Sequence, residues 1–351
     1  MQNRETLLTD KSDDDYQDYI LQDVSRTFAL TIPQLPDPLR RVVANAYLLC
    51  RIADTIEDDK HMSSEVKREF ADRFIEVVRG TQDPAAFASD MFPLLSPTAT
   101  EAEHDLIANT EPVIRITHSF NRRQRAALER CVAIMADGMA RYQDAETLDG
   151  VADLNDMGQY CYYVAGVVGE MLTELFCDYS EAIDRQREDM MQLAVSFGQG
   201  LQMTNILKDI WEDHQRGACW LPRDVFARHG VDITRKVPGQ NEPGFDAALL
   251  ELLGVAHGHL DNALAYTLNI PREETGLRRF CLWALGMAVL TLDKIRQQPD
   301  FTSGNQVKIT RRSVKGTVFM TSLFVKQDRI LRLMFDFHGR NLPKPDNHEK
   351  L

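Results

Sequence analysis

The residues best suited to chemistry are acidic side chains spaced along one helical face. In the segment AYLLCRIADTIEDD, residues 46–59, Asp58 follows Asp54 by four positions and Glu57 follows it by three. In an α-helix these spacings put the carboxylates on the same face, one above another. The residues before them are largely apolar. We therefore expect the acidic face to end a helix whose other side is buried.

A second segment repeats this pattern. In SFGQGLQMTNILKDIWED, residues 196–213, Asp209, Glu212 and Asp213 have the same spacing, and Asn205 continues the stripe by one turn. Like charges four positions apart oppose a helix by about 0.2–0.5 kcal/mol per pair, so two such clusters indicate compensation by cations. Oxygen ligands without His or Cys favour Mg²⁺, which shares its remaining positions with phosphate oxygens. A solvated acidic face is the alternative for one segment alone, and two copies favour metal sites.

Residues near the first acidic segment could complete a site for a diphosphate. Arg51 lies three positions before Asp54, where it could reach a carboxylate or a phosphate. Tyr47 extends the same stripe by one turn. Ser25 and Arg26 end the first expected helix, where a hydroxyl and a guanidinium could bind diphosphate, although Ser-Arg at a helix end is also a common surface pair.

Small residues recur on two apolar helices. The segment YCYYVAGVVGEM, which begins at Tyr160, contains Gly166 and Gly169, and the helix of the second acidic segment contains Gly198 and Gly200. Glycine costs a helix about 1 kcal/mol relative to alanine, so a bulky neighbour is expected close to the backbone. That neighbour is either another helix or a prenyl chain. The Tyr160 hydroxyl, a polar tip in an apolar wall, could stabilise a carbocation or move a proton.

These residues must be positioned by helices. The chain has 351 residues, 44% of them hydrophobic, which is enough for a sizeable core. Apolar residues recur at helical spacing without convincing strand alternation, so we predict an all-α fold in a single domain over residues 1–351, with flexible tails at 1–14 and 340–351. The expected helices cover residues 13–31, 38–59, 64–80, 121–146, 155–177, 182–214, 244–268, 275–297 and 312–338.

The composition limits the classes of partner. With 40 Lys and Arg against 53 Asp and Glu, the net charge of −13 argues against nucleic acid. Six cysteines without a CxxC pair predict free thiols in a reducing cytosol. The polar, acid-rich N-terminus is not typical of a signal or transit peptide, and no apolar run approaches the ~20 residues that span a bilayer. We expect a cytoplasmic protein without a transmembrane segment, and contact with a membrane surface stays open.

Taken together, SRTFAL, DTIEDD, YCYYVAGVVGEM, LQMTNILKDIWED and RGACWLPRD resemble the squalene and phytoene synthase family over about residues 15–300. The resemblance implies an isoprenoid-synthase helical bundle around a central cavity, with two aspartate-rich motifs facing each other across its mouth. It implies a prenyl transferase that joins two farnesyl diphosphates head to head, using Mg²⁺, to presqualene diphosphate. The C-terminal stretch QVKITRRSVKG is similar to the squalene branch, which implies NADPH-dependent rearrangement to squalene.

The resemblance also implies residue roles by position. Expected metal ligands are Asp54, Glu57, Asp58, Asn205, Asp209 and Asp213, with Glu212 matching the same motif. Expected substrate-binding residues are Ser25, Arg26, Phe28, Tyr47, Arg51, Gln202, Asn205 and Lys208. Tyr160 matches the catalytic tyrosine, beside the catalytic carboxylates Asp54, Asp58, Asp209 and Asp213. A basic patch of Lys308, Arg312 and Lys315 could meet the phosphates of NADPH, or form a solvated basic turn.

The chain departs from the family pattern at three places. Lys208 stands where the family has Arg before the second aspartate motif, and Ala218 stands where a basic residue is common, with Arg216 as a substitute. Ala284 and Leu285 replace the Pro-Gln of eukaryotic squalene synthases. These changes question the reductive step more than the condensation.

Other functions stay open at this point. The same fold could instead release presqualene diphosphate, dehydrosqualene, hydroxysqualene or phytoene without a reductant. A terpene cyclase would use one prenyl diphosphate, but its different metal motifs argue against it. A helical scaffold that binds Mg²⁺ or Ca²⁺ without chemistry would be stabilised by metal and show no turnover.

Overall fold

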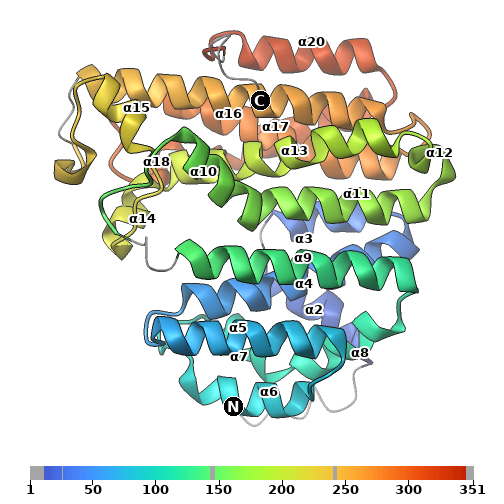
Figure 1. Cartoon of the computed structure of the whole chain (residues 1–351). Helices are drawn as coiled ribbons and strands as arrows, with labels where there is room; N and C mark the ends of the chain where they lie inside the picture. The colour runs from blue at the N-terminus through green and yellow to red at the C-terminus, as the bar shows by residue number, and fades with distance from the viewer. Residues whose placement is uncertain (1–11, 26, 143–146, 240–242, 345–351) are drawn as a thin grey trace. The chain divides into compact units, whose positions relative to one another are not determined.

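The computed structural model describes residues 12–25, 27–142, 147–239 and 243–344. Within these ranges the chain is helical and forms no strand, and its β interaction is an isolated bridge between Val151 and Pro222. The prediction of an all-α fold is confirmed (Figure 1). The chain forms two compact units: the first combines Met1–Gln143 with Glu174–Asp184, and the second combines Asp144–Thr173 with Arg185–Leu351. A single domain over 1–351 stays a prediction.

The first unit is organised around a long, buried helix. Its elements are α2 (Asp13–Val24), α3 (Phe28–Thr31), η1 (Ile32–Gln34), α4 (Asp37–Asp58), α5 (Ser64–Arg79), α6 (Pro84–Met91), η2 (Phe92–Leu94), α7 (Glu101–Ala108), α8 (Thr110–Ser119), α9 (Arg122–Tyr142) and α12 (Glu181–Asp184). Helix α4 packs against α5, α8 and α9, and Leu48, Leu49 and Ile52 are completely buried along it. This burial fixes the orientation of the acidic face at the end of α4.

The structure corrects the expected helices of the first unit. The helix predicted over 13–31 appears as two elements, α2, which ends at Val24, and α3, which begins at Phe28. Asp13 and Asp14, which fell in the predicted flexible tail, belong to α2 and form ion pairs with Arg115 and Arg41, each at 2.6 Å. The segment between α5 and α9, in which Pro93 and Pro97 suggested a loop, contains α6, η2, α7 and α8.

The second unit contains the longest helices. Its elements are α10 (Leu154–Cys161), the π turn η4 (Tyr162–Gly166), α11 (Val167–Tyr179), which ends in the first unit, α13 (Arg187–Lys208), α14 (Ile210–Arg216), α15 (Arg223–Arg228), η5 (Ile233–Arg235), α16 (Pro243–Asn269), α17 (Thr275–Gln297), α18 (Gly304–Val307), α19 (Arg311–Leu323) and α20 (Asp328–Gly339). Helices α13, α16 and α17 pack against one another, and α20 lies along α16 and α17 (Figure 1).

Three expected helices of the second unit are divided. The helix predicted over 155–177 contains the π turn, and the helix predicted over 312–338 is two helices, α19 and α20. The helix predicted over 182–214 is divided between α12 and α13 at residues 185–186, and again at Asp209, where φ and ψ are −102° and 17°. The Asp209 N–H still donates to the Asn205 carbonyl at 2.9 Å, so the interruption is local. The spacing of the second acidic motif therefore stays close to helical.

Helix α17 is long and apolar enough, by length and composition, to cross a membrane. However, 67% of its most apolar window is buried inside the protein, as in the core helix of a globular fold. All six cysteines are free thiols, as predicted, and five of them are buried.

Candidate active site

The first acidic motif shares its nearby arginine, Arg51, with a carboxylate from another helix. The Asp54 side chain is 35% exposed at the end of α4, with one carboxylate oxygen 4.0 Å from a guanidinium nitrogen of Arg51. Arg51 also forms an ion pair with Glu103 of α7. Burial, and then the negative charge of Asp58, raises the pKa of Asp54 to about 7, although Arg51 acts in the opposite direction. A raised carboxyl pKa means that the charged form is disfavoured here, first by desolvation and then by the neighbouring negative charge.

The donors at this motif fit a cation bound together with a diphosphate. The buried Nε of Arg51 has no hydrogen-bond partner in the described residues and could donate to a phosphate oxygen. Also within the described ranges, no group of three or more Asp, Glu, His or Cys side chains could hold an ion unaided. Mg²⁺ commonly takes one or two carboxylates and completes its shell with water and phosphate oxygens, so Asp54 and Asp58 suit it as a partial shell.

The acidic run is divided between the site and the fold. Asp58 is exposed, while the Glu57 carbonyl accepts a hydrogen bond from Lys67 Nζ. Asp59 is buried, and its carboxylate accepts from the backbone N–H groups of Met62 at 3.1 Å and Ser96 at 2.6 Å. The last acid of DTIEDD therefore anchors the chain after α4 rather than serving the predicted metal site.

The turn between α2 and α3 contacts α4 before the acidic motif. The Tyr47 hydroxyl donates to the Val24 carbonyl at 3.1 Å, and the Tyr47 and Phe28 ring centroids are 5.3 Å apart. Ser25 is buried, and its Oγ accepts from the Phe28 N–H at 3.0 Å. The structure thus brings Ser25, Phe28 and Tyr47 together, whereas Arg26 lies outside the described residues.

Two carboxylates of the second motif have nearby basic partners. Lys208 Nζ is 2.7 Å from the Asp209 carboxylate, and Asp213, which is buried, forms an ion pair with Arg216. The Ala218 N–H donates to the Asp213 carbonyl at 3.0 Å, and Ala218 is itself buried. A lysine at position 218 would have to bring its charge out of this buried site.

The third carboxylate of this motif holds a segment that is distant in sequence. Glu212 accepts hydrogen bonds from Ser303 Oγ and the Gly304 N–H, both at 2.9 Å. One residue earlier, Trp211 Nε1 donates to the Phe301 carbonyl at 2.6 Å. A Cβ at position 304 would lie only 2.9 Å from an Asp209 carboxylate oxygen, so the approach requires glycine. Residues 301–304 are therefore docked on α14.

The docked segment leads into the predicted cofactor residues. Lys308 follows α18, and Arg312 and Lys315 lie in the first half of α19, all three exposed. On α13, Asn205 is exposed and Gln202 is half-buried. These side chains are accessible to ligands, as their predicted roles require.

Tyr160 is packed against an aromatic ring that sequence reasoning missed. The rings of Tyr160 and Trp220 are stacked, with centroids 3.9 Å apart and an interplanar angle of 6°, and both are buried. Two backbone hydrogen bonds to Val151 hold the segment that follows Trp220. The Val151 N–H donates to the Leu221 carbonyl, and the Arg223 N–H donates to the Val151 carbonyl. Trp220 lies in the RGACWLPRD motif, so the sequence contained a signal for it.

Glycines of the second unit allow neighbouring helices to pack closely. A Cβ at Gly198 would lie 2.1 Å from the Ala165 carbonyl oxygen, and a Cβ at Gly169 would lie 2.1 Å from the Ala194 carbonyl oxygen. Of the two explanations that the sequence left open at these positions, close helix packing is the one observed.

The predicted site residues therefore form two groups. Ser25, Phe28, Tyr47, Arg51 and the first acidic motif belong to the first unit, and the remaining described ones belong to the second. That both groups form one site stays a prediction. The structure adds Glu103 and Trp220 to the candidate site residues. The capping box formed by Thr100 and Glu103 was a sequence signal for α7, the helix that carries Glu103.

Comparison with known proteins covers both groups. The model of the squalene/phytoene synthase family matches residues 21–313. The chain belongs to the squalene/phytoene synthase family. This match includes both aspartate-rich motifs, Tyr160 and the first two residues of the basic patch, Lys308 and Arg312.

Individual relatives agree with this assignment. Squalene synthase R6 of Phoma sp. is 30% identical over 332 residues, which cover 94% of this chain and 75% of that protein. The squalene synthase of Schizosaccharomyces pombe is 29% identical over 342 residues, 95% of this chain and 70% of that protein. The solved structure of TcSQS with the ligand BPH1237 is similar with a TM-score of 0.77 at 23% identity, covering 94% of this chain and 91% of that one, which shows a shared fold.

Proposed function

We propose that this member of the squalene/phytoene synthase family converts two farnesyl diphosphates to squalene. The condensation would give presqualene diphosphate, and an NADPH-dependent rearrangement would follow. The similarity to the two fungal squalene synthases over at least 94% of the chain supports this choice over sister activities without a reductant.

The observation that carries the proposal is the end of α4, where Arg51 pairs with Glu103 and lies 4.0 Å from the Asp54 carboxylate. Asp54 has its pKa raised to about 7, and the buried Arg51 Nε beside it lacks a partner in the described part of the chain. Bound Mg²⁺ would neutralise the diphosphate of the substrate and make it a better leaving group. Asp54 and Asp58 would hold the cation, and Arg51 would orient the diphosphate through charge-assisted hydrogen bonds. Asp209, Asp213 and Asn205 would act in the same way for the second motif.

We assign Tyr160 to the carbon chemistry. When one farnesyl diphosphate loses its diphosphate, the double bond of the other attacks the allylic cation, and loss of a proton closes the cyclopropane ring. The buried hydroxyl of Tyr160 would accept or relay that proton, and the stacked rings of Tyr160 and Trp220 present π-electrons to a cation. Burial excludes water, which would otherwise capture the cation.

We assign the reductive step to the segment that follows Gly304, the residue whose N–H donates to Glu212. NADPH would supply the hydride that completes squalene. Lys308, Arg312 and Lys315 would bind its phosphates, and the hydrogen bonds between Glu212 and Gly304 support a position near the second acidic motif. The cytoplasmic location expected from the sequence stays a prediction.

The test is to incubate purified protein with farnesyl diphosphate and Mg²⁺, with and without NADPH, and to identify the lipids by mass spectrometry. We expect squalene only when both Mg²⁺ and NADPH are present. Dehydrosqualene, hydroxysqualene or presqualene diphosphate as the final product in both reactions would contradict the proposal and indicate a sister activity.

A matched pair of variants on α4 tests the metal assignment. Asp54→Asn should lower the rate of condensation by about 10²–10³-fold and leave the fold intact, because it removes a charge that holds the leaving group's cation. Asp37→Asn, an exposed position at the start of the same helix, should leave the rate unchanged. Equal rates in the two variants would exclude Asp54 as a ligand.

A further inference from the structure

Helices α19 and α20 expose large apolar side chains to solvent. Phe319 and Leu323 of α19 are 65% and 58% exposed, and Leu333 and Phe337 of α20 are 67% and 58% exposed. Each pair is spaced by four positions, so each helix presents one apolar stripe. We call these four residues the α19–α20 face. Single exposed apolar residues are ordinary, but four large ones on consecutive helices indicate a binding surface.

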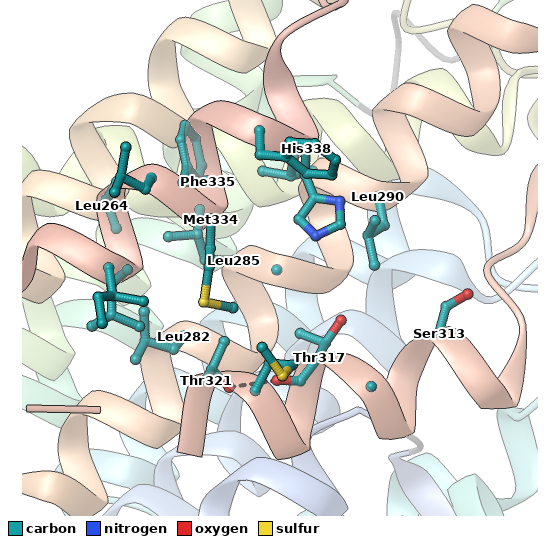
Figure 2. Close-up of a pocket in the computed structure, with 18 residues that line it drawn as sticks. Leu264, Leu282, Leu285, Leu290, Ser313, Thr317, Thr321, Met334, Phe335 and His338 are labelled. Atoms are coloured by element: carbon teal, nitrogen blue, oxygen red, sulfur yellow. Dashed lines mark hydrogen bonds between the residues drawn. The ribbon is translucent and has the colours of Figure 1, made fainter. Parts of the chain in front are cut away.

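An apolar groove opens onto this face. A cavity of about 590 Å³ lies between α17, α19 and α20; most of its lining side chains are apolar, and Ser313, Thr317, Thr321 and His338 also line it. Figure 2 shows Met334 and Leu285 projecting into the space between α19 and α20. Leu333 and Phe337 line the groove and are also exposed, so the groove is continuous with the α20 part of the face.

The same helices carry a positive charge that the rest of the chain lacks. Residues 304–340 contain eight Lys or Arg and two Asp, in a chain with a net charge of −13. The eight basic residues, all exposed, are Lys308, Arg311, Arg312, Lys315, Lys326, Arg329, Arg332 and Arg340. Among the residues that the structure describes, none of these eight has a carboxylate at ion-pair distance. The Arg340 guanidinium lies 4.3 Å from the centroid of the Phe337 ring, so positive charge borders the apolar stripe directly.

We propose that the α19–α20 face docks on the surface of an anionic lipid bilayer. Amphipathic helices with aromatic and leucine side chains beside Lys and Arg bind at the boundary between headgroups and acyl chains. Each basic residue near an anionic membrane strengthens binding by about fivefold. The acidic remainder of the chain is repelled from the same surface, which orients the protein. A second copy of this chain is a worse occupant, because it would bring two positively charged faces together.

Docking would also place the groove against the bilayer. The apolar lining then continues into the acyl-chain region without crossing water, which suits the transfer of a C30 hydrocarbon out of the protein. This use of the groove rests on the proposed function, whereas docking itself does not.

Vesicle co-sedimentation tests the apolar part of the surface. We expect wild-type protein to bind vesicles of equal phosphatidylcholine and phosphatidylserine, and to bind pure phosphatidylcholine vesicles more weakly. The double variant Leu333→Gln/Phe337→Gln should bind the anionic vesicles about tenfold or more weakly, because two apolar side chains no longer enter the lipid. The matched control Phe92→Gln/Leu94→Gln, which changes residues 44% and 41% exposed in the first unit, should bind like wild type.

A second pair of variants tests the charge. Lys326→Gln/Arg329→Gln should bind about 30-fold more weakly, and raised salt should weaken wild-type binding, because the attraction is electrostatic. Arg68→Gln/Arg122→Gln, which removes two exposed charges from the first unit, should have little effect. Circular dichroism checks that each variant is folded, and condensation in detergent should be unchanged in all of them.

Several results would overturn the proposal. These are the absence of vesicle binding by wild type, equal binding to neutral and anionic vesicles, or an equal loss in the control variants. Sedimentation showing that Leu333→Gln/Phe337→Gln dissociates a dimer, with vesicle binding unchanged, would assign the face to a second copy instead. Failure of condensation in detergent would contradict the proposed function alone, since vesicle binding is measured without substrate.

Discussion

The variant Gly198→Ala tests whether Gly198 allows a neighbouring helix to pack closely or leaves room for a substrate chain. The added Cβ would lie 2.1 Å from the Ala165 carbonyl oxygen, whereas ordinary contact begins at 3.4 Å. The two backbones must therefore separate by about 1.3 Å. Overpacking a core costs about 1–3 kcal/mol, and we expect about 3 kcal/mol because a backbone atom cannot rotate away. With an unfolding entropy of about 2.1 cal/mol/K per residue, the melting temperature should fall by roughly 4 °C.

Gly316→Ala is the matched control, measured by the same thermal unfolding followed with circular dichroism. Gly316 lies inside α19, and nothing surrounds its added Cβ within 4 Å. Alanine there should stabilise the protein by about 0.5–1 kcal/mol and raise the melting temperature by roughly 1 °C. An unchanged melting temperature in Gly198→Ala with a large loss of condensation would refute the packing explanation, because it would show that the glycine makes room for substrate.

Three further measurements address the site. Burial, and then a neighbouring carboxylate, raises the pKa of Asp54 from 3.8 to about 7. The metal-free protein should therefore lose stability as pH rises through this window, because the folded state keeps a proton that the unfolded state releases. Urea unfolding at several pH values should show this loss in wild type but not in Asp54→Asn, and the same pH dependence in both proteins would contradict the expectation. Trp220→Leu removes the ring stacked on Tyr160 and should slow condensation by about 2- to 13-fold, through loss of an aromatic contact of about 0.5–1.5 kcal/mol. An unchanged rate would argue against a role for Trp220. Glu212→Gln weakens the charge-assisted hydrogen bond from the Gly304 N–H by about 1–2 kcal/mol, so hydrogen exchange of that amide should be about tenfold faster. An unchanged exchange rate would show that the contact contributes little.

Periodicity predicted the long helices well because each buries a continuous apolar stripe. The segments predicted over 38–59, 64–80, 244–268 and 275–297 appear as α4, α5, α16 and α17, within one residue at each end. The interruptions were harder to predict. Apolar spacing continues through Asp209, and its backbone hydrogen bond to Asn205 is kept, so nothing local marks the break.

The short helices of the first unit were missed although their signals were present. Asp83 caps α6 through the Ala85 N–H, with Pro84 at the first helical position, and Thr100 caps α7 in a capping box with Glu103. Pro93, which suggested a loop, instead lies in a 3₁₀ turn at the end of α6. The prediction gave Pro93 more weight than the capping signals, although Pro93 lies at the end of α6 alone.

Spacing identified which carboxylates share a face, but it could not identify partners distant in sequence. The ion pair between Arg51 and Glu103, and the hydrogen bond between Glu212 and Gly304, join residues of separate helices. Such contacts depend on tertiary packing, which one sequence without its structure does not specify. The raised pKa of Asp54 belongs to the same class, since it depends mainly on burial.

The π turn bears on where this chain can change in length. The Val167 N–H donates to the Tyr162 carbonyl, five positions back instead of four, so the turn accommodates one extra residue between α10 and α11. Deleting one residue from positions 162–166 would leave a regular α-helix, with both flanking helices still facing their present neighbours. The same deletion inside α13 would rotate the second aspartate-rich motif by about 100°. We therefore expect a one-residue deletion to be tolerated at positions 162–166 but not inside α13, and Tyr160 lies just before the tolerant turn.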